Sequence, residues 1–152
     1  MRHLITLILV FASVVCVADT KLPKKIDNVF SSKYAGAQNM TFTATDNDYQ
    51  ISFQLEGLDK VAIISKTGEW KRTTTSLGDE MIPQCIYTAV SEKYYDYEVS
   101  DALLIETPGT TAYEITIKVT TEEYDEEKDE DIMTTESFMM KFDDQCNLQT
   151  EE

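Results

Sequence analysis

An internal repeat constrains the fold of this chain more than any other feature. Residues 22–34 recur sixty positions later as residues 82–94, with an apolar residue and a proline at the start, an isoleucine three residues after the proline, and Lys-Tyr at the end. Further along, residues 49–55 recur as residues 113–119 with the same tyrosine, isoleucine and alternation. A repeated segment of this length is typical of a repeated structural unit. The sequence therefore predicts two copies of one unit.

Each copy, at residues 22–75 and 82–150, is expected to hold one helix followed by four strands. Proline suits the first turn of a helix, and apolar residues follow it at spacings of three and four on one face: Ile26, Val29, Phe30 and Tyr34, then Ile86, Ala89, Val90 and Tyr94. Alternation of apolar and polar residues predicts the strands: 40–45, 49–56, 61–65 and 70–75 in the first copy, and 99–106, 112–120, 135–142 and 146–150 in the second.

The predicted fold class is α+β, with two tandem units that each pack an N-terminal helix on a four-stranded antiparallel meander sheet. One apolar face of each sheet has to be buried, and the helix is the element that can cover it. The alternate residues of the strands are polar, so the opposite face of the sheet is expected to stay open.

The N-terminal sequence predicts a secretory signal peptide at residues 1–18. A short positive head precedes an apolar run of about 14 residues, shorter than the roughly 20 that span a bilayer, and Cys16 and Ala18 supply the small residues at a cleavage site. We expect cleavage after Ala18 and a periplasmic or secreted protein without a transmembrane span in its mature part. Lipid attachment at Cys16 is the alternative.

Charge excludes several classes of partner and of chemistry. The net charge is −15 and the isoelectric point is about 4.3, so phosphate backbones and anionic lipids repel the chain. His3 is the one histidine, and it leaves with the signal peptide. Because the mature chain then lacks the commonest general base and metal ligand, we expect no catalytic residue, no cofactor and no metal site.

Two cysteines remain after the signal peptide, Cys85 and Cys146. In an oxidising compartment such a pair is a disulfide candidate. Two separately buried thiols are the other interpretation, and spacing alone does not decide between them.

An acidic run occupies residues 122–131, where eight of ten residues are Asp or Glu. A run of like charge repels itself, so we expect a long, mobile hairpin loop inserted between two strands of the second unit. Clustered carboxylates also attract cations, which makes cation binding an alternative function for this segment.

Aromatic side chains supply the candidates for contact with a partner, because they are enriched at binding hot spots. Trp70 and Tyr113 are assigned mainly to the core. The candidate contacts are the turn that presents Asp48 and Tyr49, together with two tyrosines that follow the second helix, Tyr95 and Tyr97.

The order of these motifs resembles the secreted PepSY-like proteins, also described as beta-lactamase-inhibitor-like. The resemblance rests on Pro-x-x-Ile-x-x-x-Phe-x-x-Lys-Tyr, Ala-x-Asn, Tyr-x-Ile-x-Phe and Gly-x-Trp, carried here by Pro23, Ile26, Phe30, Lys33, Tyr34, Ala37, Asn39, Tyr49, Ile51, Phe53, Gly68 and Trp70. The second copy departs from the pattern, with Tyr97 in place of Ala37 and with Cys146 and Leu148 in place of Gly68 and Trp70.

This resemblance implies an exported protein of bacterial type, especially from the Bacteroidetes, whose two sheets lie side by side as a concave protein-binding surface. It implies no catalytic activity. We therefore expect a non-catalytic, monomeric binding module, with an inhibitory or regulatory role, whose open sheet face binds another exported protein. The alternative is a cation-binding or envelope-structural protein whose function is carried by the acidic run.

Overall fold

The computed structural model describes residues 21–125 and 130–152. The predicted signal peptide, with Cys16 and Ala18, lies outside the described residues. The elements follow the expected order of a helix and four strands, twice: α1 (Lys24–Lys33), β1 (Gln38–Ala44), β2 (Asp48–Leu55), β3 (Leu58–Ser65), β4 (Trp70–Ser76), a 3₁₀ turn (Asp79–Met81), α2 (Gln84–Ser91), β5 (Tyr97–Thr107), β6 (Thr110–Asp125), β7 (Glu130–Asp143) and β8 (Leu148–Glu151).

The eight strands form one antiparallel sheet in the order β1 to β8. Two separate four-stranded sheets were expected, and the join between them is the difference: Thr73–Ser76 of β4 pair with Leu103–Glu106 of β5. The physical reason is that each four-stranded sheet would leave an edge of unpaired N–H and C=O groups, and pairing β4 with β5 satisfies both edges.

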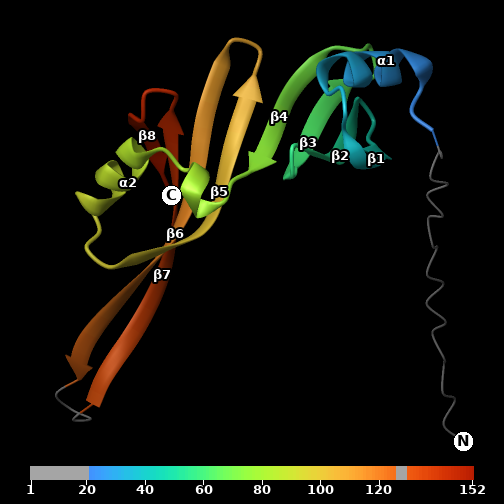
Figure 1. Cartoon of the computed structure of the whole chain (residues 1–152). Helices are drawn as coiled ribbons and strands as arrows, with labels where there is room; N and C mark the ends of the chain where they lie inside the picture. Colours follow the sequence, from blue (N-terminus) through green and yellow to red (C-terminus); the bar gives the residue numbers. More distant parts are fainter. Residues whose placement is uncertain (1–20, 126–129) are drawn as a thin grey trace, which may run out of the picture.

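Both helices cover the same face of this sheet. Directly paired residues point to the same side, and one row of pairs runs from Phe53 through Lys60, Thr75, Leu104 and Tyr113 to Phe142. Phe53 belongs to the core under α1, and Phe142 belongs to the core under α2. Figure 1 shows the two helices at opposite ends of the sheet.

The buried residues form two clusters, one under each helix. From α1, Ile26 and Phe30 pack on Ile51, Phe53, Ala62 and Ile64, and from α2, Ile86 and Val90 pack on Ala102, Ile115, Ile117, Met140 and Phe142. These helix residues are among the apolar positions that the sequence spacing predicted. The face of the sheet away from the helices belongs to neither cluster.

The Lys-Tyr pair at the end of each repeat ties the helix to the last strand of its set. In the first, the Tyr34 hydroxyl bonds to Oγ1 of Thr73, a fully buried residue of β4 that also accepts the indole N–H of Trp70 at 2.9 Å. The Lys33 ammonium lies 3.8 Å from the centroid of the Trp70 ring, within cation–π range.

In the second repeat the same pair contacts a carboxylate of β8. The Tyr94 hydroxyl donates to Glu151 Oε1 at 2.5 Å, and the Lys93 ammonium forms an ion pair with Glu151 Oε2. Burial and this hydrogen bond raise the pKa of Tyr94 to about 12, whereas the bonds from Lys93 and Tyr94 lower the pKa of Glu151. In both repeats the Lys-Tyr pair therefore connects the helix to the last strand, but through different partner side chains.

The acidic run is not the long loop that the sequence predicted. Strand β6 continues to Asp125 and β7 starts at Glu130, with pairs from Glu122–Met133 to Asp125–Glu130. Beyond the Tyr97–Val119 pair no β5 residue accompanies β6, so β6 and β7 leave the sheet as a two-stranded ribbon (Figure 1). Like charge in the sequence does not prevent this pairing, because an antiparallel ladder joins backbone N–H and C=O groups. Residues 126–129 lie outside the described part.

Replacing Thr73 by valine should destabilise the protein. The shape of the side chain is kept, but the Tyr34 hydroxyl and the Trp70 N–H lose their shared partner, which costs about 2 kcal/mol when polar groups are buried. Urea unfolding measures the loss. Thr74→Val, on the same strand but the opposite face, is the matched control and should change the unfolding free energy little; equal effects of the two variants would contradict the assigned role of Thr73.

Glu151→Gln should destabilise the protein in a pH-dependent way. A carboxyl whose folded pKa lies below its unfolded value stabilises the fold above the unfolded pKa, and this contribution is lost as pH falls through the folded pKa. The difference in urea midpoint between wild type and variant should therefore be largest near neutral pH and shrink below about pH 4. The exposed neighbour Glu152, changed to Gln, serves as control; a difference independent of pH would refute the tie.

Candidate functional site

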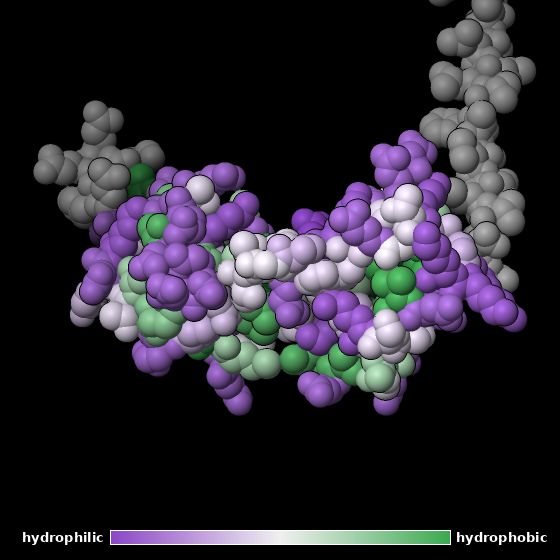
Figure 2. Space-filling model, turned by 90° about the horizontal axis from the view of Figure 1, so that it is seen from above, coloured by the Kyte–Doolittle hydropathy of each residue, from purple (hydrophilic) through white to green (hydrophobic). Residues whose placement is uncertain are grey.

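The candidate site is the face of the sheet opposite the helices, called here the open face. Its rows follow from the strand pairing: one runs Thr41, Ser52, Val61, Thr74, Ile105, Ala112 and Asp143, and another runs Ser76, Leu103, Glu114, Lys141 and Thr150. Because β4 pairs with β5, these rows cross from the first repeat into the second without a break. The molecule as a whole is bowed, with two hydrophilic ends and a hollowed middle where paler, less hydrophilic residues gather (Figure 2).

The centre of the open face is apolar and its surroundings are polar. Val61, Ile63, Leu103 and Ile105 are half-buried although they belong to neither core cluster. Around them lie hydroxyl, amide and charged side chains, which are Thr41, Thr43, Gln50, Ser52, Gln54, Asp59, Arg72, Thr74, Ser76, Glu114, Thr116 and Lys141. An apolar centre with a polar rim is the usual composition of a protein interface.

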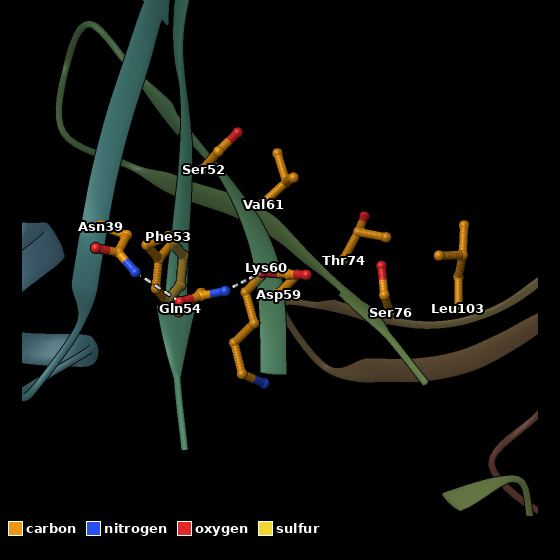
Figure 3. A pocket seen from close by; sticks show the side chains of 10 residues that line it. All are labelled: Asn39, Ser52, Phe53, Gln54, Asp59, Lys60, Val61, Thr74, Ser76 and Leu103. Carbon is orange, nitrogen blue, oxygen red and sulfur yellow. Dashed lines mark hydrogen bonds between the residues drawn. The ribbon is translucent and has the colours of Figure 1, made fainter. Parts of the chain in front are cut away.

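A shallow pocket of about 420 Å³ opens on this face where β1 to β5 meet (Figure 3). It is lined by Asn39, Ser52, Phe53, Gln54, Asp59, Lys60, Val61, Thr74, Ser76 and Leu103. Asn39 Nδ2 donates to Gln54 Oε1 at 2.6 Å, and Gln54 Nε2 donates to Asp59 Oδ1 at 2.9 Å. A chain of three polar side chains from three strands therefore borders the pocket.

A β-bulge places Asn39 at this pocket. Gln38 pairs with Gln54 and Thr41 pairs with Ser52, so Asn39 and Met40 together lie opposite Phe53. Asn39 has a φ of 52°, in the left-handed region that asparagine tolerates better than most residues. In the sequence, Asn39 stands out only as part of the Ala-x-Asn motif. The polar alternation at Gln50, Ser52 and Gln54 predicts the open face, but no sequence signal predicts the bulge.

The structure places Asp48 and Tyr49 at the start of β2 and engages both of them within the chain. Asp48 Oδ1 lies 2.6 Å from the Lys71 ammonium, and the ion pair leaves 24% of the Asp48 side chain exposed. Tyr49 packs against the first core and meets the Phe42 ring at 6.3 Å between centroids. Strand alternation directs the two side chains to opposite faces, so they do not form one contact surface.

Tyr95 and Tyr97 lie after α2, at the start of β5 rather than near Asp48. Tyr95 is fully exposed. Tyr97 packs against the second core, and its hydroxyl lies 3.1 Å from Ser91 Oγ. The structure therefore does not bring the four candidate contacts together, and their contact with a partner stays a prediction.

A disulfide joins Cys85 and Cys146, whose Cα atoms are 5.9 Å apart. It connects the first turn of α2 to the turn between β7 and β8. Asp143 organises that turn by accepting the backbone N–H groups of Gln145 and Asn147 at 2.9 and 2.8 Å, and bonds from Asn147 lower its pKa. Of the two interpretations of Cys85 and Cys146, a disulfide or two separate thiols, the structure contains the disulfide.

None of the helices within residues 21–125 and 130–152 has the length and apolar composition of a membrane span. In the same residues, no group of three or more His, Cys, Asp or Glu side chains is arranged to hold a metal ion.

The fold and the open face define a class: an α+β protein with one antiparallel sheet, helices on a single face and the other face free. The chain belongs to the family described as "Putative beta-lactamase-inhibitor-like, PepSY-like", whose model matches it twice in tandem, at residues 12–62 and 60–150. The two matches agree with the repeat found in the sequence. No curated protein matches the chain.

Solved structures share this fold at low sequence identity. A BLIP-like protein from Bacteroides fragilis has a TM-score of 0.69 at 19% identity, covering 88% of both chains. A DUF2874 family protein from Bacteroides uniformis has a TM-score of 0.69 at 12% identity, covering 87% of this chain and 89% of the other. A protein from Bacteroides eggerthii described as "putative periplasmic" has a TM-score of 0.67 at 12% identity, covering 87% and 88%.

Removing the disulfide should lower stability without changing the fold. Closing a loop with a sequence separation of 61 residues restricts the unfolded chain, which corresponds to about 4 kcal/mol in the chain-entropy model. Guanidinium unfolding of the double variant Cys85→Ala, Cys146→Ala measures this loss, and reduction of the wild type should lower its stability by a similar amount. Unchanged stability of the wild type on reduction would show that the bond contributes nothing.

Proposed function

We propose that the chain is a non-catalytic exported protein whose open face binds another exported protein and so inhibits or regulates it. The family is beta-lactamase-inhibitor-like, and a structural relative is described as periplasmic, which supports export. Export is also what the apolar N-terminal run predicts. The signal peptide, the monomeric state and the two-unit boundaries at 22–75 and 82–150 are part of this proposal.

The observation that carries the proposal is that both helices cover one face of an eight-stranded sheet. The opposite face is continuous across the join of β4 and β5, and its central side chains are aliphatic. An antiparallel sheet commonly exposes one face to water, but such a face is usually polar throughout. Burial of Val61, Leu103 and Ile105 under a partner would stabilise the complex by about 25 cal/mol per Å² of apolar surface removed from water.

The polar rim supports specificity rather than bulk affinity. Lys141 lies 3.5 Å from Glu114, and Gln54 bonds to Asp59, so several rim groups are already oriented before a partner arrives. Groups oriented in advance lose little entropy on binding. A partner that matches their donors and acceptors is preferred over one that leaves them unpaired.

Two variants separate this function from one based on the acidic run. Ile105→Arg places a charge at the centre of the open face and leaves the helices untouched. In the matched variant, Asn-Gly replaces residues 122–133, so that the Thr121–Thr134 pair closes the hairpin with a two-residue turn. Each variant is compared with the wild type by urea unfolding to confirm that it folds.

The mature wild type should recover a stoichiometric protein from an extract of the secreted and periplasmic proteins of its organism. Ile105→Arg should weaken this binding more than about tenfold, because central apolar residues carry most of the binding energy of an interface. The ribbon variant, in which Asn-Gly replaces residues 122–133, should bind as the wild type does. Isothermal titration with the recovered protein gives the affinities. Loss of binding in the ribbon variant alone would assign the function to the acidic run, and recovery of no stoichiometric partner would count against protein binding.

A further inference from the structure

Among the residues that the structure describes, one charge is directed toward the pocket on the open face. Of its ten lining residues two are charged, Asp59 and Lys60. The Lys60 side chain extends away from Ser52, Val61 and Thr74 (Figure 3), and its ammonium donates to Thr75 Oγ1 at 2.9 Å. Thr75 lies in the row that contains Phe53 and Phe142, so the lysine charge is held toward the helix-bearing face. The pocket therefore presents the charge of Asp59 alone.

That carboxylate sets the direction of the hydrogen bonds around it. A carboxylate only accepts, so Gln54 has to present its Nε2 to Asp59 and its Oε1 to Asn39. Asn39 in turn has to present Nδ2 to Gln54, which leaves its Oδ1 as an acceptor. The chain thus has an acceptor at each end: Oδ1 of Asn39 and the second carboxylate oxygen of Asp59.

These two acceptors have no hydrogen-bond or ion-pair partner among the residues that the structure describes. Three hydroxyls, those of Ser52, Thr74 and Ser76, add further acceptors along the pocket. Val61 and Leu103 supply an apolar side. The pocket is therefore rich in acceptors, carries negative charge and has one aliphatic wall.

We infer that this pocket binds the guanidinium of an arginine side chain that the partner protein presents. A guanidinium has five donors in a plane and no acceptor, which suits the second carboxylate oxygen of Asp59 and the hydroxyls along the pocket, and its positive charge complements that carboxylate. Its three methylene groups would pack on Val61 and Leu103, as long cationic side chains commonly do on apolar surface. A volume of about 420 Å³ is sufficient for one such side chain.

Two other features of the molecule support a cationic occupant. The chain carries a net charge of −15, so its field attracts a positively charged partner and repels an acidic one. The bulge at Asn39 is a separate observation: an extra residue with a φ of 52° re-aims the asparagine side chain toward Gln54. Bulges that re-aim a side chain are over-represented next to functional sites.

The inference rests on the proposed function for the claim that the arginine belongs to a protein, but the pocket can be tested without any partner. The probe is Nα-acetylarginine amide, and its control is Nα-acetylcitrulline amide, which has the same shape and no charge. Chemical shifts of ¹⁵N-labelled residues 19–152 report where each probe binds. The arginine probe should shift the side-chain amides of Asn39 and Gln54, and the citrulline probe should bind at least about tenfold more weakly.

Three variants assign the contacts. Asp59→Asn should weaken the arginine probe about tenfold, because it removes the charge and the fixed direction of the amide chain. Asn39→Gly keeps the positive φ and removes the amide that orients Gln54 toward Asp59, so it should weaken the probe about fivefold. Glu56→Gln removes a charge from the neighbouring hairpin turn and should leave the affinity unchanged.

Several outcomes would overturn the inference. They are equal binding of arginine and citrulline probes, wild-type affinity in Asp59→Asn, shifts confined to the acidic ribbon, or no shift at Asn39 and Gln54 with up to about 50 mM probe. None of these bears on the recovery of a partner by the open face. Conversely, a failure to recover a partner leaves arginine binding at Asp59 intact, so the two proposals fail separately.

Discussion

The pairing of β4 with β5 is the interaction on which the rest of the structure depends. Four residues of each strand, Thr73–Ser76 and Leu103–Glu106, hold two repeats in one sheet. Through this short ladder both helices come to lie on the same face and the open face becomes continuous. If the join were absent, Val61 and Ile105 would lie on separate sheets and the apolar centre of the open face would not exist.

The two repeats also show what was kept and what changed after the duplication. Each Lys-Tyr pair still ties the helix to the last strand, through Thr73 and Trp70 in one repeat and through Glu151 in the other. The second repeat has in addition the disulfide and the extended β6–β7 ribbon. The additions lie away from the pocket, which β1 to β5 form. The proposed arginine site is therefore a property of the first repeat and its join to the second.

Much of the fold could be predicted because its signals are local. The spacing of Ile26 and Phe30, and the alternation through Ile51 and Phe53, identify the helix face and the strand face that form the first core. The acidic run was wrongly predicted to be a loop, because like charge argues against burial but does not prevent the backbone pairing of two strands. The pocket could not be predicted, because its lining comes from five strands and from a bulge at Asn39. The alternation of apolar and polar residues in the sequence does not reveal that bulge.

The residue pattern alone thus specified the repeat, the helix and strand order, and which side chains of a strand share a face. These depend on periods of 3.6 and 2 residues, which are set by the backbone of each element. Only the tertiary structure decided that eight strands form one sheet, that both cysteines meet, and that Asn39, Gln54 and Asp59 border one pocket. Those outcomes depend on which strand edges pair and in what register. The periodicity of one strand does not determine which distant strand it pairs with.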